Sequence, residues 1–298
     1  MTVTVLDSCS AMRDILEAPV RRRLGLLREM MAPVTGLYRY VPGEVDLATM
    51  HRFAFGFPVD RAVDRCREAL DVLREADAWT RIRRALDDAV EVQRRATPAA
   101  AIPDITVVLV LGDPEDDHFT HECLGVSGNG SVTGYIALTL WPFPENVERL
   151  EATAVHELNH NLRYAPGGVV WDPRSVTVGE QVVSEGLADA FARQLYGDAL
   201  GRTRIGVPSL DDDAIFEKVV SGLEVTDMRN FTAWVHGDAS ARRFGVRPVG
   251  LPTGAGYAAG NRLVDAYLSA TGRTAADALH IPSREIIDTA LGRAGGGS

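Results

Sequence analysis

The stretch "AVHELNHNL", residues 154–162, places His156 and His160 four residues apart, with Glu157 directly after the first histidine. Residues four apart lie on one face of an α-helix, about 5–6 Å from each other, so both imidazoles can reach a single ion. Zinc accepts such nitrogen ligands in tetrahedral geometry. Glu157 lies about a third of a turn away, where a general base could reach water at the metal. Two histidines with only local hydrogen bonds on an ordinary helix are the alternative interpretation.

The apolar residues around this stretch predict how the helix packs. Spaced three and four apart, they form a stripe on the face opposite the histidines, made up of Val147, Leu150, Ala154, Leu158 and Leu162. We expect this stripe to pack while the histidine face borders a cleft. The helix should begin near Pro144, since proline suits the first turn, and end before "APGG" at residues 165–168.

The next predicted helix, "TVGEQVVSEGLADAFARQLYG" at residues 177–197, offers a third ligand. Thr177 precedes Glu180 by three residues, as in a capping box, and Gly197 is a typical residue just after a helix end. An apolar stripe is formed by Val183, Leu187, Ala190 and Leu195. Glu185 and Asp189 lie away from this stripe, so we expect Glu185 to bind the metal and Asp189 to accept the second ring N–H of a ligating histidine. A solvated acidic face is the alternative.

Taken together, these motifs resemble known metallopeptidases. HELNH followed by Glu185, 25 residues after His160, resembles the gluzincin pattern of thermolysin-type enzymes, although the spacing is a few residues longer and leaves the path of residues 165–178 open. The segments "AVHELNHNLRY", "VVSEGLADAFA" and "GYAAGNRLVDAYL" are similar to the DUF2268 family of predicted zinc-dependent proteases, over roughly residues 105–268.

The resemblance implies a set of site residues and a fold. It implies His156, His160 and Glu185 as zinc ligands and Glu157 as general base. It also implies a zincin-like fold in which "GYIALTL", residues 134–140, is a sheet-edge strand beside the cleft, where an extended peptide could pair.

A group that stabilises the oxyanion is harder to find. We select Tyr257 in "GYAAG" because a phenol near a helix start, held by glycines, could donate to developing charge on a carbonyl oxygen. A tyrosine packed beneath the zinc helix is the equal alternative, and His236, His118 and His121 are further options. The stretch "DDHFTHE", residues 116–122, could hold a second ion, but an exposed polar loop is the preferred interpretation.

The remaining patterns predict an α+β fold that is predominantly α, with a small sheet and an active-site helix. Helical periodicity runs from Ser10 to about Ala96, and "TPAAAIP" at residues 97–103 suits a connector. "ITVVLVLG" at residues 105–112 reads as a buried strand, followed by two short strands around an Asn129–Gly130 turn. We therefore expect an N-terminal helical region at residues 1–100 and a zincin-like metallopeptidase domain at residues 101–294. Residues 295–298, "GGGS", are set aside as a flexible tail of the kind that cloning leaves.

Composition excludes several classes of protein. The net charge of -10 argues against binding to nucleic acid or anionic lipid, which rewards an excess of Lys and Arg. Three scattered cysteines support neither a disulfide framework nor a cysteine zinc site. Without a signal-peptide pattern or a long apolar run, we expect a soluble, cytoplasmic protein.

The expected function is zinc-dependent hydrolysis of peptide bonds, with a peptide or protein as substrate and Zn²⁺ as cofactor. One alternative keeps the metal but cleaves a small amide or another non-peptide substrate, because fold and site do not settle the substrate. Another is a regulatory or binding protein that retains the metal site. Glu157 argues against that second alternative, since a purely structural zinc site has no use for a base. The oligomeric state is left open.

Overall fold

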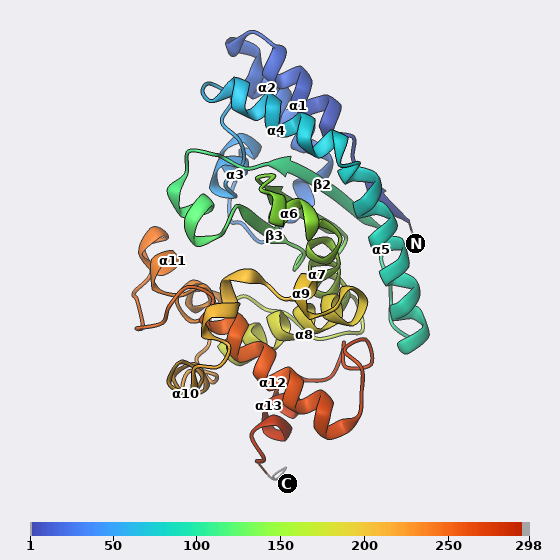
Figure 1. Ribbon diagram of the computed structural model, residues 1–298, viewed down its shortest axis with the longest axis vertical. Coiled ribbons are helices and arrows are strands. Elements are labelled where there is room, and N and C mark those ends of the chain that lie inside the picture. Colours follow the sequence, from blue (N-terminus) through green and yellow to red (C-terminus); the bar gives the residue numbers. More distant parts are fainter. Residues whose placement is uncertain (1, 294–298) are drawn as a thin grey trace. The chain divides into compact units, whose positions relative to one another are not determined.

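The protein is predominantly helical with one small mixed sheet, as the computed structural model shows for residues 2–293 (Figure 1). This confirms the expected α+β class. The four strands are β1 (Val3–Val5), β2 (Ile105–Leu111), β3 (Val126–Asn129) and β4 (Tyr135–Leu140). The α-helices are α1 (Ser8–Glu17), α2 (Val20–Met31), α3 (Leu47–Phe53), α4 (Val63–Glu75), α5 (Ala78–Ala96), α6 (Pro144–Glu148), α7 (Leu150–Arg163), α8 (Val178–Tyr196), α9 (Asp198–Gly201), α10 (Asp213–Val220), α11 (Asp238–Arg243), α12 (Ala255–Thr271) and α13 (Ser283–Ala290). Short helical turns are η1 (Ala32–Tyr38), η2 (His118–Glu122), η3 (Arg204–Ser209), η4 (Met228–Asn230) and η5 (Thr232–His236). The expected tail at residues 295–298 lies outside the described residues.

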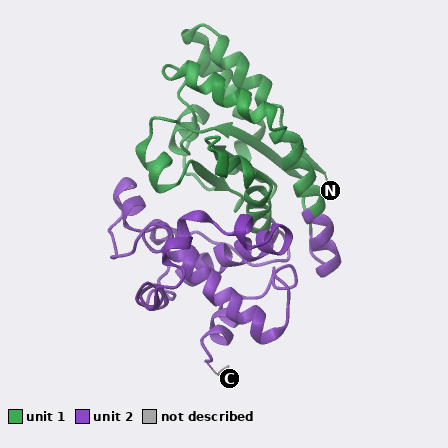
Figure 2. Ribbon diagram, in the orientation of Figure 1, with its two compact units in different colours: residues 1–88, 102–161 green, residues 89–101, 162–298 purple. Residues whose placement is uncertain are grey.

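Packing divides the chain into two units (Figure 2). The first comprises residues 1–88 and 102–161 and holds the sheet with the helices α1 to α4. The second comprises residues 89–101 and 162–298 and is helical in its described part. The boundary expected near residue 100 does not coincide with this division and stays a prediction about domains.

The sheet of the first unit has the strand order β1-β2-β4-β3. Strand β2 runs parallel to β1 and to β4, whereas β3 pairs antiparallel with β4 in the register Val126↔Leu140. Strand β1 was not predicted, because three residues carry too short a pattern to recognise. The three strands predicted, one at residues 105–112 and two around the Asn129–Gly130 turn, are confirmed, although the connection between β3 and β4 extends to Gly134.

The expectation that residues 134–140 form a sheet-edge strand is wrong, because β4 is paired on both sides. The edge next to it is β3. Its short, glycine-containing sequence "VSGN" suits an edge, whereas the apolar "YIALTL" suits the interior of a sheet.

The helix that carries HELNH begins at Pro144 and ends at Arg163 as expected, but it is broken in two. Arg149 leaves helical geometry at φ -96° and ψ 10°, which ends α6 and allows α7 to begin at Leu150. Residues 154–163 of α7 are all buried. We predicted that one face of this helix packs and that the other borders a cleft. The helix is more completely enclosed than that, since both faces are buried over residues 154–163.

The second unit is built around α8, and α12 packs along it. The Thr177 half of the predicted capping box is confirmed, because the Thr177 side chain accepts a hydrogen bond from the Glu180 N–H, whereas the Glu180 carboxylate accepts from Arg163. Gly197 follows the helix at φ 76°, as expected. Every residue from Val178 to Ala192 is buried, so α8 has no solvated face over that stretch. The alternative of an exposed acidic pair at Glu185 and Asp189 is thereby excluded.

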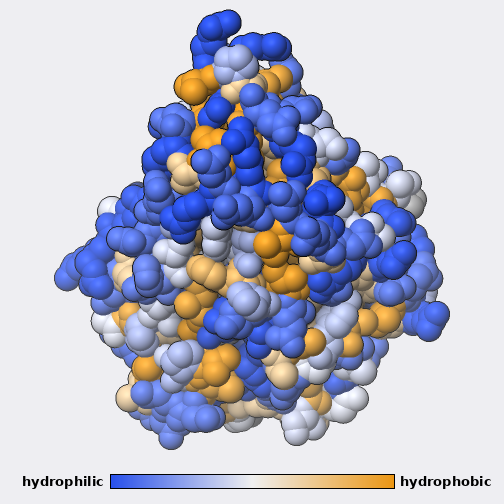
Figure 3. Space-filling view, turned by 45° about the horizontal axis from the view of Figure 1, so that its top comes forward, coloured by the Kyte–Doolittle hydropathy of each residue, from blue (hydrophilic) through white to orange (hydrophobic). Residues whose placement is uncertain are grey.

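The surface carries mostly hydrophilic residues on the face shown in Figure 3, with hydrophobic residues gathered in smaller patches between them. Among residues 2–293, none of the helices combines the length and the apolar character needed to cross a bilayer. The three cysteines are free thiols, as expected.

Candidate metal centre

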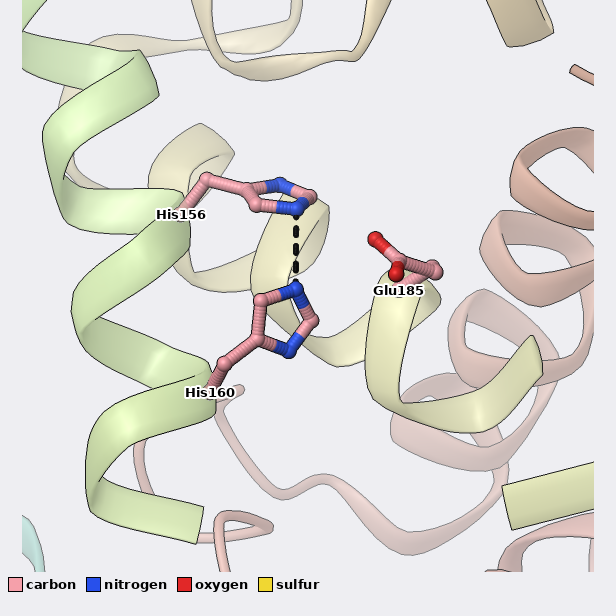
Figure 4. A group of neighbouring side chains, drawn as sticks. All are labelled: His156, His160 and Glu185. Carbon is pink, nitrogen blue, oxygen red and sulfur yellow. Dashed lines mark hydrogen bonds between the residues drawn. The ribbon is translucent and has the colours of Figure 1, made fainter. Parts of the chain in front are cut away.

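His156, His160 and Glu185 come together in the structure (Figure 4). The two histidines project from consecutive turns of α7 and point toward the carboxylate of Glu185 on α8. One potential ligand atom of each side chain lies within 4.8 Å of the others. All three side chains are buried, with exposed fractions of 7%, 4% and 6%. These residues therefore form a group that can hold a metal ion, as the sequence spacing predicts.

The donor set fits zinc. The Nε2 atoms of His156 and His160 are 3.1 Å apart. Two nitrogens bonded to one tetrahedral zinc ion at about 2.0–2.1 Å stand about 3.3 Å apart, so this separation is close to a tetrahedral edge. Two imidazoles and one carboxylate are also a ligand set found in catalytic zinc sites, which keep a fourth position for water or substrate.

Glu157 lies against the edge strand of the sheet. A Cβ atom on Gly128 would overlap with Glu157 Oε1, and one on Gly130 would overlap with the backbone carbonyl of Glu157. Only glycine lets β3 and the following residue approach this turn of α7 so closely. The sequence pattern predicted a turn at Gly130 and no special role for Gly128. The SGNG pattern before a strand could have indicated a close backbone approach.

Asn161, the residue after HELNH, fastens α7 to the connection between β3 and β4. Its fully buried amide bonds to backbone groups of that connection and of the first residue of β4: Nδ2 donates to the carbonyls of Gly130, Val132 and Tyr135 at 2.8–3.2 Å, and Oδ1 accepts from the Gly134 N–H at 2.9 Å. A buried amide that satisfies this many backbone groups fixes both partners. Nothing in the local sequence around Asn161 indicates this role.

Asp189 is fully buried and extensively hydrogen-bonded. Its carboxylate accepts from the Thr203 N–H at 3.0 Å, from the Thr203 hydroxyl at 2.6 Å and from Asn261 Nδ2 at 2.7 Å. These bonds hold the carboxylate in a fixed orientation. The expected hydrogen bond from a ligating histidine to Asp189 stays a prediction.

Tyr257 is in the first turn of α12, after the N-cap Gly254. It is buried, and its ring meets that of His236 edge-on with centroids 5.8 Å apart. Asn261 Nδ2 donates both to the Tyr257 carbonyl and to Asp189, which links this turn of α12 to α8. The structure thus places two of the candidate oxyanion donors, Tyr257 and His236, side by side. Their catalytic role stays a prediction.

The stretch at residues 116–122 forms η2 and buries Phe119. Within residues 2–293, the His156–His160–Glu185 group is the only one in which three potential metal-ligating side chains converge.

With this geometry in place, comparison with protein families gives a specific match. The model of a family described as "Predicted Zn-dependent protease (DUF2268)" matches residues 85–288, well over half of the chain. The chain belongs to this family. The matched DUF2268 region contains the whole His156–His160–Glu185 group together with Glu157, Asp189 and Tyr257.

A curated relative comes from Bacillus subtilis (strain 168) and is named "Uncharacterized protein YjfC". It is 28% identical to this chain over 232 residues, which cover 76% of this chain and 75% of the relative. No solved structure matches the chain.

Proposed function

We propose that this DUF2268 protein is a zinc-dependent peptidase of the gluzincin type, with a zincin-like catalytic region. The observation that carries the proposal is the buried His156–His160–Glu185 group, with Glu157 next in sequence to the first ligand. The family description, a predicted zinc-dependent protease, supports the same function. Two imidazoles and a carboxylate suit zinc better than hard ions such as Mg²⁺ or Ca²⁺, which prefer oxygen ligands.

The side chains around the metal group have distinct roles in this proposal. A zinc ion held by His156, His160 and Glu185 would supply Lewis-acid polarisation of the scissile carbonyl and a lowered pKa for water. Glu157 takes the proton of the attacking water and passes it to the leaving amine. Tyr257 donates a hydrogen bond to the developing oxyanion, and the adjacent His236 is the alternative donor.

An extended peptide is the substrate class that the sheet favours. Strand β3 pairs with β4 along one side and is the last strand of the sheet on the other. An extended peptide can add to such an edge through main-chain hydrogen bonds. Because Gly128 of β3 lies against Glu157, a peptide paired there would run past the proposed base. The pairing role first assigned to residues 134–140 thus passes to β3.

The test compares wild-type protein with Glu157→Gln. Both are loaded with zinc and offered a library of unstructured peptides beside a set of small amides, with product formation followed by mass spectrometry. Removing the base should lower the rate of peptide hydrolysis by about 10²–10⁴-fold while zinc content stays the same.

A matched control is Glu148→Gln, the same chemical change on a side chain that is 66% exposed in α6. It should leave hydrolysis unchanged. Full activity of Glu157→Gln would contradict the proposal. Wild-type hydrolysis of small amides but of no peptide would replace the peptidase with a small-amide hydrolase.

A further inference from the structure

Arg163, the last residue of α7, is buried completely, and each nitrogen of its guanidinium group has a hydrogen-bond acceptor. Its Nε and Nη2 atoms donate to the two carboxylate oxygens of Glu180 at 2.7 and 2.9 Å, in a bidentate pair. Its Nη1 atom donates to the carbonyls of Leu279 at 2.7 Å and Ile281 at 3.2 Å. This is the fork geometry that only arginine provides.

Glu180 is in the first turn of α8, where its own N–H is capped by Thr177. The Tyr164 hydroxyl donates to Glu180 Oε1 at 3.0 Å. Burial, reinforced by the charge of Glu180, raises the pKa of the Tyr164 phenol well above its ordinary value, so it remains a neutral donor. We call Arg163, Tyr164 and Glu180 the α7–α8 clamp.

The clamp is close in sequence to the metal group on both helices. Arg163 follows His160 by three residues in α7, and Glu180 precedes Glu185 by five residues in α8. These separations correspond to about 4.5 and 7.5 Å along the helix axes. A shift or rotation of either helix at the clamp would therefore move a proposed ligand by a similar amount.

Stability alone gives a weak reason for a buried ion pair at this place. Removing two charges from water is costly, and well-packed apolar residues of similar size often replace such a pair at no loss of stability. A bidentate pair, by contrast, adds geometric specificity, because its guanidinium and carboxylate groups must align with each other. The clamp joins the end of α7 to the start of α8. It can therefore fix how these two helix ends are oriented to each other.

We propose that the α7–α8 clamp is a positioning device that sets the distance between the histidines of α7 and Glu185 of α8. This inference rests on the proposed function, because it assumes that the three side chains bind zinc. Arg163, Tyr164 and Glu180 act through the ligands and are not themselves catalytic residues.

The test replaces the clamp without leaving an unpaired charge. Glu180→Gln alone would strand the buried Arg163 charge and could prevent folding. The triple variant Arg163→Met, Tyr164→Phe and Glu180→Leu removes all three polar groups at similar volume. Arg163→Lys is the second variant, which keeps the positive charge but loses the bidentate fork.

The matched control is a second Arg–Glu pair on α7. Arg81 binds Glu151 through two contacts of 2.6 Å, and Glu151 precedes His156 by five residues. That pair joins α5 to α7 within the first unit. The control variant carries Arg81→Met and Glu151→Leu.

Three quantities are measured for each protein: thermal stability without metal, zinc affinity by competition with a chelator, and the absorption spectrum of the Co²⁺-loaded form. We expect the triple variant and Arg163→Lys to bind zinc about 10–100-fold more weakly than wild type, as when groups outside the ligand shell are lost. Their Co²⁺ spectra should change as well, whereas the control variant should bind zinc within twofold of wild type.

The outcomes separate the two proposals. Folded clamp variants with wild-type zinc affinity and wild-type Co²⁺ spectra would overturn the positioning role and leave the proposed function intact. Zinc affinity that falls equally in the control variant would also overturn the positioning role. The loss of any ion pair on α7 would then be enough to weaken zinc binding. Wild-type protein that binds neither ion would overturn the proposed function, and the clamp's role with it.

Discussion

At the scale of single residues, the surroundings of Glu157 offer a way to test hydrolysis separately from metal binding. The proposed ligands are His156, His160 and Glu185, whereas the carboxylate of Glu157, the proposed base, lies against Gly128 of the edge strand. A side chain added at Gly128 would therefore meet the proposed base first, since the three atoms nearest to its Cβ all belong to Glu157.

Gly128→Ala is expected to displace the Glu157 carboxylate, because the new methyl group overlaps with its Oε1. The overlapping atoms belong to a side chain that can turn aside, so the fold should survive. Misplacing a reacting group by about 1 Å can cost about 10²-fold in rate, and we expect kcat for peptide hydrolysis to fall by that order. Steady-state kinetics and zinc content measured on the same sample check this. Lost zinc together with lost activity would show that Gly128 supports the metal group instead.

The sequence alone could identify the residues whose types and spacing carry chemistry. His156, His160 and Glu185 were predicted as a group from a four-residue helical spacing and a capped helix that follows, and the structure brings them together. Asn161 and the clamp were not predicted. Their roles depend on partners distant in the chain, such as Gly134 for Asn161 and Glu180 for Arg163, and local spacing contains no information about such partners.

At the scale of elements, α8 and α12 cross where both have glycine. A Cβ atom on Gly186 would overlap with the backbone of Gly260, and one on Gly260 would overlap with the carbonyl of Val182. Backbone cannot turn aside as a side chain can. The crossing is therefore set by the absence of side chains at these two positions, and Gly186 directly follows the proposed ligand Glu185.

Gly186→Ala should lower the free energy of unfolding by about 1–3 kcal/mol, since overpacking against the backbone of α12 outweighs the better helix propensity of alanine. Gly25→Ala is the matched control in α2, where a Cβ meets nothing within 4 Å. It should raise the free energy of unfolding by about 0.4–1 kcal/mol. Chemical denaturation of the two variants checks both signs. If both variants were stabilised, the close crossing of α8 and α12 would be contradicted.

Elements with clear periodicity were predicted well, and their neighbours in space were not. Strand β2 and the capped start of α8 match the sequence patterns, because turn chemistry and apolar runs act locally. The order of strands in the sheet depends on pairing between distant segments. For this reason β4 was wrongly predicted to be an edge strand. The break at Arg149 lies inside a continuous helical pattern and gave no signal.

At the scale of the whole molecule, the two compact units of the chain do not follow the changes of periodicity along its sequence. The change from helical to strand periodicity near residue 100 suggested a boundary, yet the sheet packs in one unit with the helices that precede it (Figure 2). Periodicity reports on the type of each element and not on what packs against it. The composition of α8 could have predicted that it is buried on all sides, because Glu185 and Asp189 are the only charged residues between Gln181 and Ala192.

Zinc binding by His156, His160 and Glu185 underlies everything proposed for this protein, and elemental analysis of purified protein measures it directly. After incubation with zinc and removal of the excess, wild-type protein should retain about one zinc ion per chain, as a single catalytic site requires. Glu185→Ala should retain far less, while Glu157→Gln should match wild type. Wild-type protein without zinc, or Glu185→Ala with a full complement, would contradict the proposed metal centre.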